Sequence, residues 1–217
     1  MNQAQTSTQC PLCSSDDFIS FHHNNKRNYL KCHQCKLVFL TPSEHPSPEE
    51  DKARYLKHEN NPTDEGYRTF LKRLSSCIIP KLRQNSFGLD FGAGYAPTLS
   101  LIMREEGFLM EDYDLHFSPN TTCLQKQYDF ISCCETIEHF YHPIKEFEQF
   151  DVLLKKGAWL GIMTEMLENE TGFHKWWYPH DLTHVAFYQK ETFFWISERF
   201  NWAIEFPRKN VALFQKN

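Results

Sequence analysis

Short apolar runs alternate with amphipathic stretches along the second half of the chain. The apolar runs predict strands at 86–91, 109–115, 128–134, 158–164, 201–206 and 210–215. Between them, the pattern predicts helices at 97–106, 119–126, 143–155 and 190–200. Such alternation builds a mostly parallel sheet with helices on both faces, so we expect an α/β fold. Because only Pro207–Lys209 separates the last two strands, we expect them to pair antiparallel at the sheet edge.

The middle of the chain shows a different pattern. Three prolines in seven residues mark Thr41–Pro48 as a linker without regular structure. Helices are predicted at 49–59 and 64–84, and Asp64 is the expected N-cap of the second. The chain is therefore predicted to divide into a front module at 1–41, a linker and helical lid at 42–85, and a main domain at 86–217.

The front module carries two C-x2-C pairs, Cys10 with Cys13 and Cys32 with Cys35. Each pair can form a knuckle that points two thiolates at one metal ion, and two knuckles on a β-hairpin complete a tetrahedral zinc site. Two disulfides are the alternative, but a chain without an export signal should seldom keep them in a reducing compartment. With four cysteines filling the coordination shell, we expect a structural zinc ion that does no chemistry.

The charge of the chain narrows the classes of partner. The whole chain has a net charge of −5, while residues 86–217 carry 19 acidic and 11 basic side chains, a net charge of −8. A surface that neutralises phosphates would have the opposite bias, which argues against a nucleic-acid substrate. No apolar run reaches the roughly 20 residues of a membrane-spanning helix, and the first residues, MNQAQTSTQ, do not resemble a signal peptide. We therefore expect a cytoplasmic protein without membrane contact.

The segment Phe87–Asp114 carries the clearest chemical signal. A strand gives way to a helix at Gly92 and Gly94, where residues without side chains let a ligand approach the backbone closely. Asp114 follows 20 positions after Gly94, the separation that places a carboxylate near ribose hydroxyls at the tip of the neighbouring strand. The run lacks the third glycine of a dinucleotide site, and Asp90 would repel a pyrophosphate. A nucleoside cofactor with a free amino group fits these residues better.

Four motifs in order resemble those of class I S-adenosylmethionine-dependent methyltransferases. They are LDFGAG at 89–94, YD at 113–114, YDFISCCE at 128–135 followed by IEH, and LLKKGAWL at 153–160. The resemblance covers about residues 53–217 and implies a Rossmann-like sheet with an antiparallel C-terminal hairpin. Only thirteen residues separate Asp114 from Tyr128, so the third strand that the family uses near the adenine is expected to be short or missing.

The resemblance also implies roles for individual residues. The two glycines would pass under the methionine part of S-adenosylmethionine, with Asp90 near its amino group. Asp114 would hold the ribose hydroxyls. Cys134 and Glu135 would line the wall beside the sulfonium.

The order of cysteine module, linker, helical lid and methyltransferase domain resembles a bacterial subgroup with an N-terminal zinc ribbon. That resemblance extends to WY at 177–178 and DLTHVAFY at 181–188. Methyltransferases with a comparable N-terminus include sugar C-methyltransferases. The resemblance therefore implies a small-molecule acceptor, such as a sugar or a nucleotide-sugar.

A long insert is predicted at 165–189, after the strand at 158–164. Within it, residues 172–184 are the candidate wall for the acceptor, because loops at strand ends are where such folds bind ligands. Trp177, Tyr178 and His180 are the expected acceptor contacts. The alternative is that the aromatic side chains cover the sheet and that His180 and Asp181 cap the turn into the next segment.

Two histidines are candidates for a general base. His184 follows the aromatic residues of the insert, and His139 follows the strand predicted at 128–134. Asp181 is the expected partner that orients a histidine by accepting its ring N–H. For His139 the alternative is a packing role at the start of a helix.

Three further possibilities stay open from the sequence. An enzyme acting on RNA, with the zinc ribbon as its grip, is disfavoured by the acidic main domain. A non-catalytic protein that keeps the fold and recruits a partner is the second. Third, Tyr55, His58 and Asn60 could close over the cofactor or simply form a solvated helix end.

Overall fold

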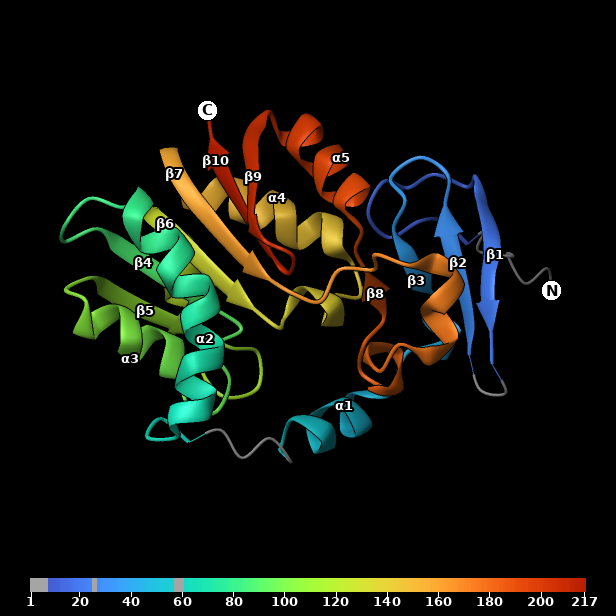
Figure 1. The fold of residues 1–217 in the computed structure, drawn as a ribbon, viewed down its shortest axis with the longest axis horizontal. Helices are drawn as coiled ribbons and strands as arrows, with labels where there is room; N and C mark the ends of the chain where they lie inside the picture. The colour runs from blue at the N-terminus through green and yellow to red at the C-terminus, as the bar shows by residue number, and fades with distance from the viewer. Residues whose placement is uncertain (1–7, 25–26, 57–60) are drawn as a thin grey trace.

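The computed structural model describes residues 8–24, 27–56 and 61–217. Its larger sheet has six strands in the order β5-β4-β6-β7-β10-β9 (Figure 1). These strands are β4 Phe87–Phe91, β5 Leu109–Tyr113, β6 Tyr128–Cys134, β7 Leu154–Met163, β9 Trp202–Arg208 and β10 Val211–Lys216. Strands β5, β4, β6 and β7 run parallel, whereas β10 pairs antiparallel with both β7 and β9. The predicted sheet with its antiparallel C-terminal hairpin is confirmed.

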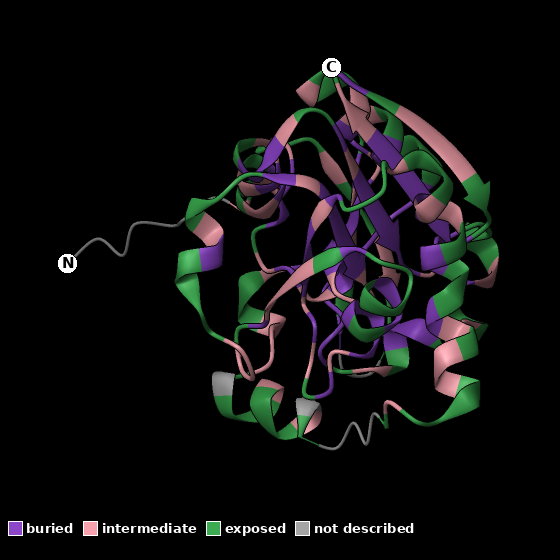
Figure 2. Ribbon diagram, turned by 90° about the vertical axis from the view of Figure 1, so that its left-hand side faces the viewer, coloured by how far each residue is buried: buried purple, intermediate pink, exposed green. Residues whose placement is uncertain are grey.

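Two pairs of helices cover the two faces of this sheet (Figure 1). They are α2 Glu65–Ile78 with α3 Thr98–Glu105 on one face, and α4 Pro143–Leu153 with α5 Lys190–Phe200 on the other. The strands supply both cores by alternation: on β10, Leu213 packs with α2 and α3, and Phe214 packs with α4 and α5. Figure 2 shows the buried residues concentrated in the strands and the exposed ones on the outer sides of the helices.

A smaller antiparallel sheet lies beside the large one, at the right of Figure 1. In sheet order its strands are β1 Phe18–His23, β2 Asn28–Cys32, β3 Val38–Leu40 and β8 Ala186–Phe187. The first three strands come from the front module, whereas β8 comes from the insert that precedes α5. The front module and the insert thus share one sheet, and the division of the chain at residue 41 stays a prediction.

Strand β3 of the smaller sheet is buried on both faces. Phe39 joins the core that α4 and α5 cover, together with the cysteines of the front module. Val38 and Leu40 face the other way and pack with Phe173 and Tyr178 of the insert. The front module is therefore held between the main core and the insert.

The prediction that Thr41–Pro48 has no regular structure is wrong. A 3-10 helix, η1 Pro42–Glu44, lies within it, and α1 Pro48–Tyr55 begins at its last proline. Proline is tolerated at the first helical position, because an N–H there would have no intrahelical partner. Ser47 and Glu50 add a capping box: the Glu50 amide donates to Ser47 Oγ at 3.2 Å, and the Ser47 amide donates to Glu50 Oε2 at 2.8 Å.

The helix predicted at 143–155 ends two residues early. Strand β7 begins directly after α4, because Leu154 already pairs with Tyr128 of β6. The pairing then shifts register, which is a β-bulge, and Gly157 near it has φ +78°. Gly157 thus serves the strand and does not end a helix. The remaining short 3-10 helices are η2 Ile79–Lys81, η3 Thr121–Gln125, η4 Ile137–His139, η5 Glu170–Lys175 and η6 Tyr178–His180.

Strand β5 is an edge of the large sheet. After it, Asp114 forms an isolated bridge with Ser118, and η3 follows before β6 begins. No third strand is present in this fully described stretch, as the short spacing predicted. Across the described ranges, no helix combines the length and the apolar character needed to cross a membrane.

Candidate functional site

The turn after β4 is held against the end of β5. Gly92 and Gly94 have φ values of +82° and +70°, which disfavour any residue with a Cβ. The Gly92 amide donates to the carbonyl oxygen of Tyr113 at 2.8 Å. A Cβ on Gly92 would lie 2.3 Å from the side chain of Thr136, so the close approach at this glycine is to the protein itself.

Asp114 fixes this turn from the tip of β5. Its Oδ2 accepts a hydrogen bond from the Gly94 amide at 2.9 Å. Its Oδ1 accepts from the amides of His116 and Phe117 at 2.8 and 3.0 Å. The carboxylate is 5% exposed and lines the cavity described below. Because two carboxylate oxygens offer about four lone pairs, Asp114 can still accept bonds from a ligand.

Asp90 lies deeper, on β4 itself. Ser132 Oγ donates to Asp90 Oδ1 at 2.8 Å. Burial raises the pKa of the Asp90 carboxyl to about 7. Asp90 is not among the residues that line the cavity described below. It lies behind the cavity wall, and its predicted position beside the amino group of a cofactor stays a prediction.

A cavity of about 270 Å³ opens at the carboxyl ends of the parallel strands. Nine of the residues singled out in the sequence line it: Gly92, Gly94, Asp114, Cys134, Glu135, His139, Trp177, Asp181 and His184. A second cavity of about 920 Å³ adjoins it and contains His180. Arg54, Trp177 and Asp181 line both cavities, which therefore meet at these three side chains.

Two buried carboxyls form the inner wall of the smaller cavity. Thr164 Oγ1 donates to Glu138 Oε2 at 2.9 Å, and the Tyr178 hydroxyl donates to Glu135 Oε2 at 3.2 Å. Burial, and then the neighbouring charge of Glu138, raise the pKa of Glu135 to about 9. Burial raises the pKa of Glu138 to about 7. Burial also holds the pKa of the Cys134 thiol well above its usual value, which disfavours a thiolate nucleophile.

The two candidate bases stand side by side, with ring centroids 4.7 Å apart. His139 Nδ1 lies 3.1 Å from the Thr183 carbonyl oxygen, and His184 Nδ1 lies 2.9 Å from the Tyr178 carbonyl oxygen. Because a carbonyl oxygen only accepts, each Nδ1 carries a hydrogen. Burial lowers the pKa of His184 to about 4, so this imidazole is neutral at physiological pH and its Nε2 carries the lone pair.

Asp181 contacts Arg54 and Thr183, and its predicted role in orienting a histidine stays a prediction. Its Oδ2 is 2.9 Å from Arg54 Nε and 2.6 Å from Arg54 Nη2, and its Oδ1 accepts from the Thr183 amide and hydroxyl. Burial opposes this charge, but the Arg54 and Thr183 bonds hold the pKa of Asp181 below its usual value. Backbone carbonyls hold Nδ1 of both His139 and His184.

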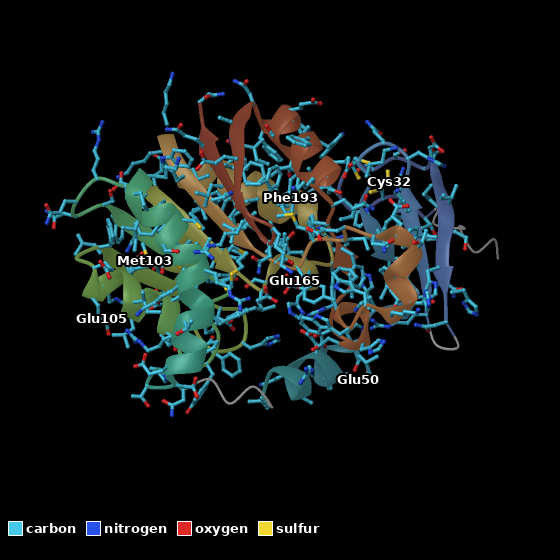
Figure 3. The ribbon with its side chains drawn as sticks, in the orientation of Figure 1. Cys32, Glu50, Met103, Glu105, Glu165 and Phe193 are labelled. Atoms are coloured by element: carbon cyan, nitrogen blue, oxygen red, sulfur yellow. The ribbon has the colours of Figure 1, made fainter. Side chains whose placement is uncertain are left out.

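The predicted acceptor contacts fall in different places. Trp177 is 60% exposed at the junction of the cavities, whereas Tyr178 is fully buried and lines neither of them. In Figure 3 the side chains between the two sheets meet near Glu165, and α1 with Glu50 lies below them. The predicted lid residues His58 and Asn60 lie outside the described residues.

Three polar side chains that line the cavity were not singled out from the sequence. Arg54 of α1 and Tyr67 of α2 line it from the lid side. Glu138 stands directly before the singled-out His139, but its neighbours gave it no distinguishing pattern. Tyr67 belongs to the apolar stripe of α2, and this stripe was the only sequence feature that indicated a wall on this side of the cavity.

The four front cysteines converge on one point, near the sulfur atoms beside Cys32 in Figure 3. Their Sγ atoms all lie within 4.8 Å of one another, with 3.4 Å between Cys10 and Cys35 and between Cys13 and Cys32. These separations are too long for disulfides. They suit a tetrahedron around zinc, in which Zn–S bonds of about 2.3 Å give S···S edges of roughly 3.8 Å.

Comparison with known proteins supports the same conclusion as the geometry. Residues 56–205 match the family model of the methyltransferase domain. No curated protein matches the chain. Three solved structures share the fold at low identity: a candidate sarcosine dimethylglycine methyltransferase from Galdieria sulphuraria, an O-methyltransferase family protein from Burkholderia thailandensis, and a Haloferax volcanii methyltransferase in complex with its activator Trm112.

The first has a TM-score of 0.51 and 15% identity, over 73% of this chain and 74% of its own. The second has 0.50 and 12%, over 81% and 65%, and the third 0.50 and 10%, over 78% and 99%. The family match spans most of the chain. The glycine turn after β4, Asp114 at the tip of β5 and most residues of the cavity lie within the matched residues. The chain therefore belongs to the class I S-adenosylmethionine-dependent methyltransferases.

Proposed function

We propose that this protein transfers a methyl group from S-adenosylmethionine to a small-molecule acceptor. The observation that carries this proposal is the pair of cavities that meet at Arg54, Trp177 and Asp181. The smaller one contains the glycine turn and Asp114, and the larger one provides a separate space next to it. A cofactor and an acceptor need such adjoining spaces, because transfer requires their reacting atoms to be in line and in contact.

The smaller cavity fits the cofactor. Asp114 would accept the ribose hydroxyls, and the glycine turn offers backbone without side chains. Tyr67 and Phe70 of α2 line the opposite wall, where aromatic faces suit a sulfonium cation. Cys134 and Glu135 would complete the wall beside it. When bound, S-adenosylmethionine supplies a methyl group on a positively charged sulfur, which an acceptor atom can take by displacement.

The chain itself has to align the acceptor and exclude water. Trp177 and His180 of the larger cavity are proposed to contact the acceptor, since an aromatic face and a polar ring suit a hydroxyl-bearing molecule such as a sugar. Tyr178 acts from below by holding Glu135 through its hydroxyl. Asp181 is proposed as a positioning residue, because it ties Arg54 of α1 to the insert.

His139 and His184 are proposed to activate the acceptor. Both have their Nδ1 anchored on a backbone carbonyl, and both line the cavity of the proposed cofactor site. The pKa of about 4 makes His184 a weak general base on its own at neutral pH, so proton removal by this ring would contribute little.

We also propose that the cysteine cluster holds one structural zinc ion. Four thiols in tetrahedral reach leave no coordination position open for substrate. The ion would fix the front module, whose strand β3 pairs with β8 of the insert.

Isothermal titration with S-adenosylmethionine and with S-adenosylhomocysteine tests the cofactor assignment. We expect micromolar binding of at least one ligand. Asp114→Asn should weaken that binding by about 1.5–3 kcal/mol, roughly 10- to 100-fold, because a charged acceptor of ribose hydroxyls becomes neutral. Asp112→Asn is the matched control, since Asp112 lies two residues earlier and bonds Arg104 at 2.7 Å. No binding by folded, zinc-loaded protein would overturn the proposal.

The acceptor class needs a second assay. Turnover of hydroxyl-bearing small molecules, such as nucleotide-sugars, should change little with salt concentration. Activity confined to RNA, falling steeply between 50 and 200 mM salt as expected of phosphate contacts, would contradict a small-molecule acceptor.

A further inference from the structure

We propose that Glu138, His139 and His184 form a site for a divalent metal ion in the methyl-transfer cavity, distinct from the cysteine cluster. One potential ligand atom from each residue lies within 4.8 Å of the other two. All three residues line the cavity that contains the glycine turn. Two imidazoles and one carboxylate are a common ligand set for divalent first-row metal ions, with positions left for other ligands.

The histidine tautomers are already those that a metal ion requires. Each Nδ1 hydrogen is bound to a backbone carbonyl, of Thr183 for His139 and of Tyr178 for His184. Metal-binding histidines usually have their second nitrogen anchored in this way, because it fixes the ring and leaves the other lone pair for the ion.

Glu138 supplies an oxygen that the protein does not otherwise use. The residue is fully buried, and Thr164 fixes its Oε2 at 2.9 Å. Its Oε1 is buried and accepts no hydrogen bond from the described residues, while His139 Nε2 lies 4.0 Å away. A buried carboxylate oxygen without a hydrogen bond destabilises the fold, and a bound cation would offset that cost.

The charges around the cluster also favour a cation. The Glu135 Oε1 atom is likewise buried without a hydrogen-bond partner in the described part of the chain. Glu135 and Glu138 line the same cavity, and a cation between them would offset the repulsion between their carboxyl oxygens. Arg54, which also lines the cavity, is engaged by Asp181.

The segments that carry the ligands are locked together. The Val185 amide donates to the Glu138 carbonyl at 2.9 Å, and the Tyr188 hydroxyl donates to the Ile137 carbonyl at 3.1 Å. Arg27 of the front module, 6% exposed, donates to the His184 carbonyl at 3.2 Å. Preformed ligand positions lower the cost of binding an ion, because little side-chain freedom is lost.

The role of this ion rests on the proposed methyl transfer. A divalent ion in the cavity would bind an oxygen of the acceptor and lower the pKa of its hydroxyl, so that the proton passes to water. The resulting oxygen forms the new bond to the methyl carbon as the carbon–sulfur bond breaks and its electron pair stays on sulfur. The acceptor class is thus an oxygen donor, a hydroxyl or an enol.

Binding of Mn²⁺ to the zinc-loaded protein tests the site without turnover. Mn²⁺ prefers nitrogen and oxygen ligands, so it should not displace zinc from four thiolates. Electron paramagnetic resonance of free Mn²⁺ should report one bound ion per chain. Glu138→Gln, which keeps the side-chain length, and His184→Asn should each weaken binding more than about tenfold. His142→Asn and Glu165→Gln are the controls and should leave it unchanged.

Bound zinc and S-adenosylhomocysteine affinity show whether each variant is folded. If the wild-type protein binds S-adenosylhomocysteine but no Mn²⁺, Co²⁺ or Fe²⁺ at millimolar concentration, the metal site is wrong and the methyltransferase assignment stands. Equal Mn²⁺ binding by wild type, Glu138→Gln and His184→Asn would also overturn the site. Mn²⁺ binding without binding of either cofactor form would instead count against the proposed function.

Discussion

At the scale of single residues, two glycines with positive φ angles are required for different reasons. Gly92 has φ +82° and faces Thr136 so closely that a Cβ would lie 2.3 Å from its side chain. Gly107 has φ +90°, but nothing lies within 4 Å of the position of its Cβ. The first glycine is therefore required by both conformation and packing, and the second by conformation alone.

Replacement of each glycine by alanine separates the two requirements. Gly107→Ala should lower the free energy of unfolding by about 1–2 kcal/mol, the cost of a left-handed conformation. Gly92→Ala should cost clearly more, because the turn must also move away from Thr136. Urea unfolding at pH 7 measures both values. Equal losses would mean that the turn accommodates a Cβ without strain.

Asp90 predicts a pH dependence of stability. Its pKa is about 7 in the fold and near 3.8 in the unfolded chain, so the folded state binds the proton more tightly. The stabilisation is therefore fully present below pH 3.8 and is lost as the pH rises through 7. Relative to wild type, Asp90→Asn should gain about 1–3 kcal/mol of unfolding free energy between pH 5 and pH 8.

Asp129 on β6 provides the control of opposite sign. Burial raises its pKa, but hydrogen bonds from Lys155 and the Phe87 amide outweigh this and lower it. Its stabilisation is present at neutral pH and is lost as the pH falls through the lowered value. Asp129→Asn should therefore lose stability relative to wild type at neutral pH and not in acid. A flat difference for Asp90→Asn across this range would show that its carboxyl is ionised in the fold.

At the scale of elements, the insert and α1 close the site together. Arg54 of α1 forms an ion pair with Asp181, which also accepts hydrogen bonds from the Thr183 amide and hydroxyl. The strands and long helices of the main domain could be predicted from periodicity, because their apolar faces repeat at fixed spacing. The contact between α1 and the insert could not be predicted, since it joins residues 127 positions apart through one partly exposed and one largely buried charge.

The coupling between these elements can be measured directly. A double-mutant cycle with Arg54→Met and Asp181→Asn should show a coupling of roughly 1 kcal/mol in urea unfolding, above the usual value for exposed pairs because Asp181 is only 10% exposed. Arg68 with Glu105 is a comparison pair whose carboxylate is 50% exposed. Additive losses at Arg54 and Asp181 would show that the pair does not link α1 to the insert.

At the scale of the whole molecule, the cysteine cluster and the cavity are parts of one structure. Strand β3 pairs with β8, and Arg27 binds the backbone of the loop that carries His184. The sequence indicated the cysteine cluster because C-x2-C spacing is local, and it indicated the glycine turn after β4 for the same reason. It gave no sign of β8, whose two residues have a partner only after the fold is complete.

Zinc removal should therefore disturb the insert as well as the front module. In hydrogen exchange, Cys32→Ser should lose protection at Ala186–Phe187 and at β3, while β10 in the large sheet keeps most of its protection. Cys77→Ser on α2 lies outside the cluster and should behave like wild type. Unchanged protection at Ala186–Phe187 in the zinc-free protein would show that the cysteine cluster does not stabilise the insert.

The pairing of β3 with β8 also has a consequence for the order in which the protein folds. Val38 leaves the ribosome about 150 positions before its partner Phe187. At 5–20 residues per second, the front module waits roughly 8–30 seconds for the strand that completes its sheet. A zinc ion captured early would keep the first three strands together through this interval and shield an open sheet edge from other chains. The cluster would then serve the nascent chain before it serves the finished enzyme.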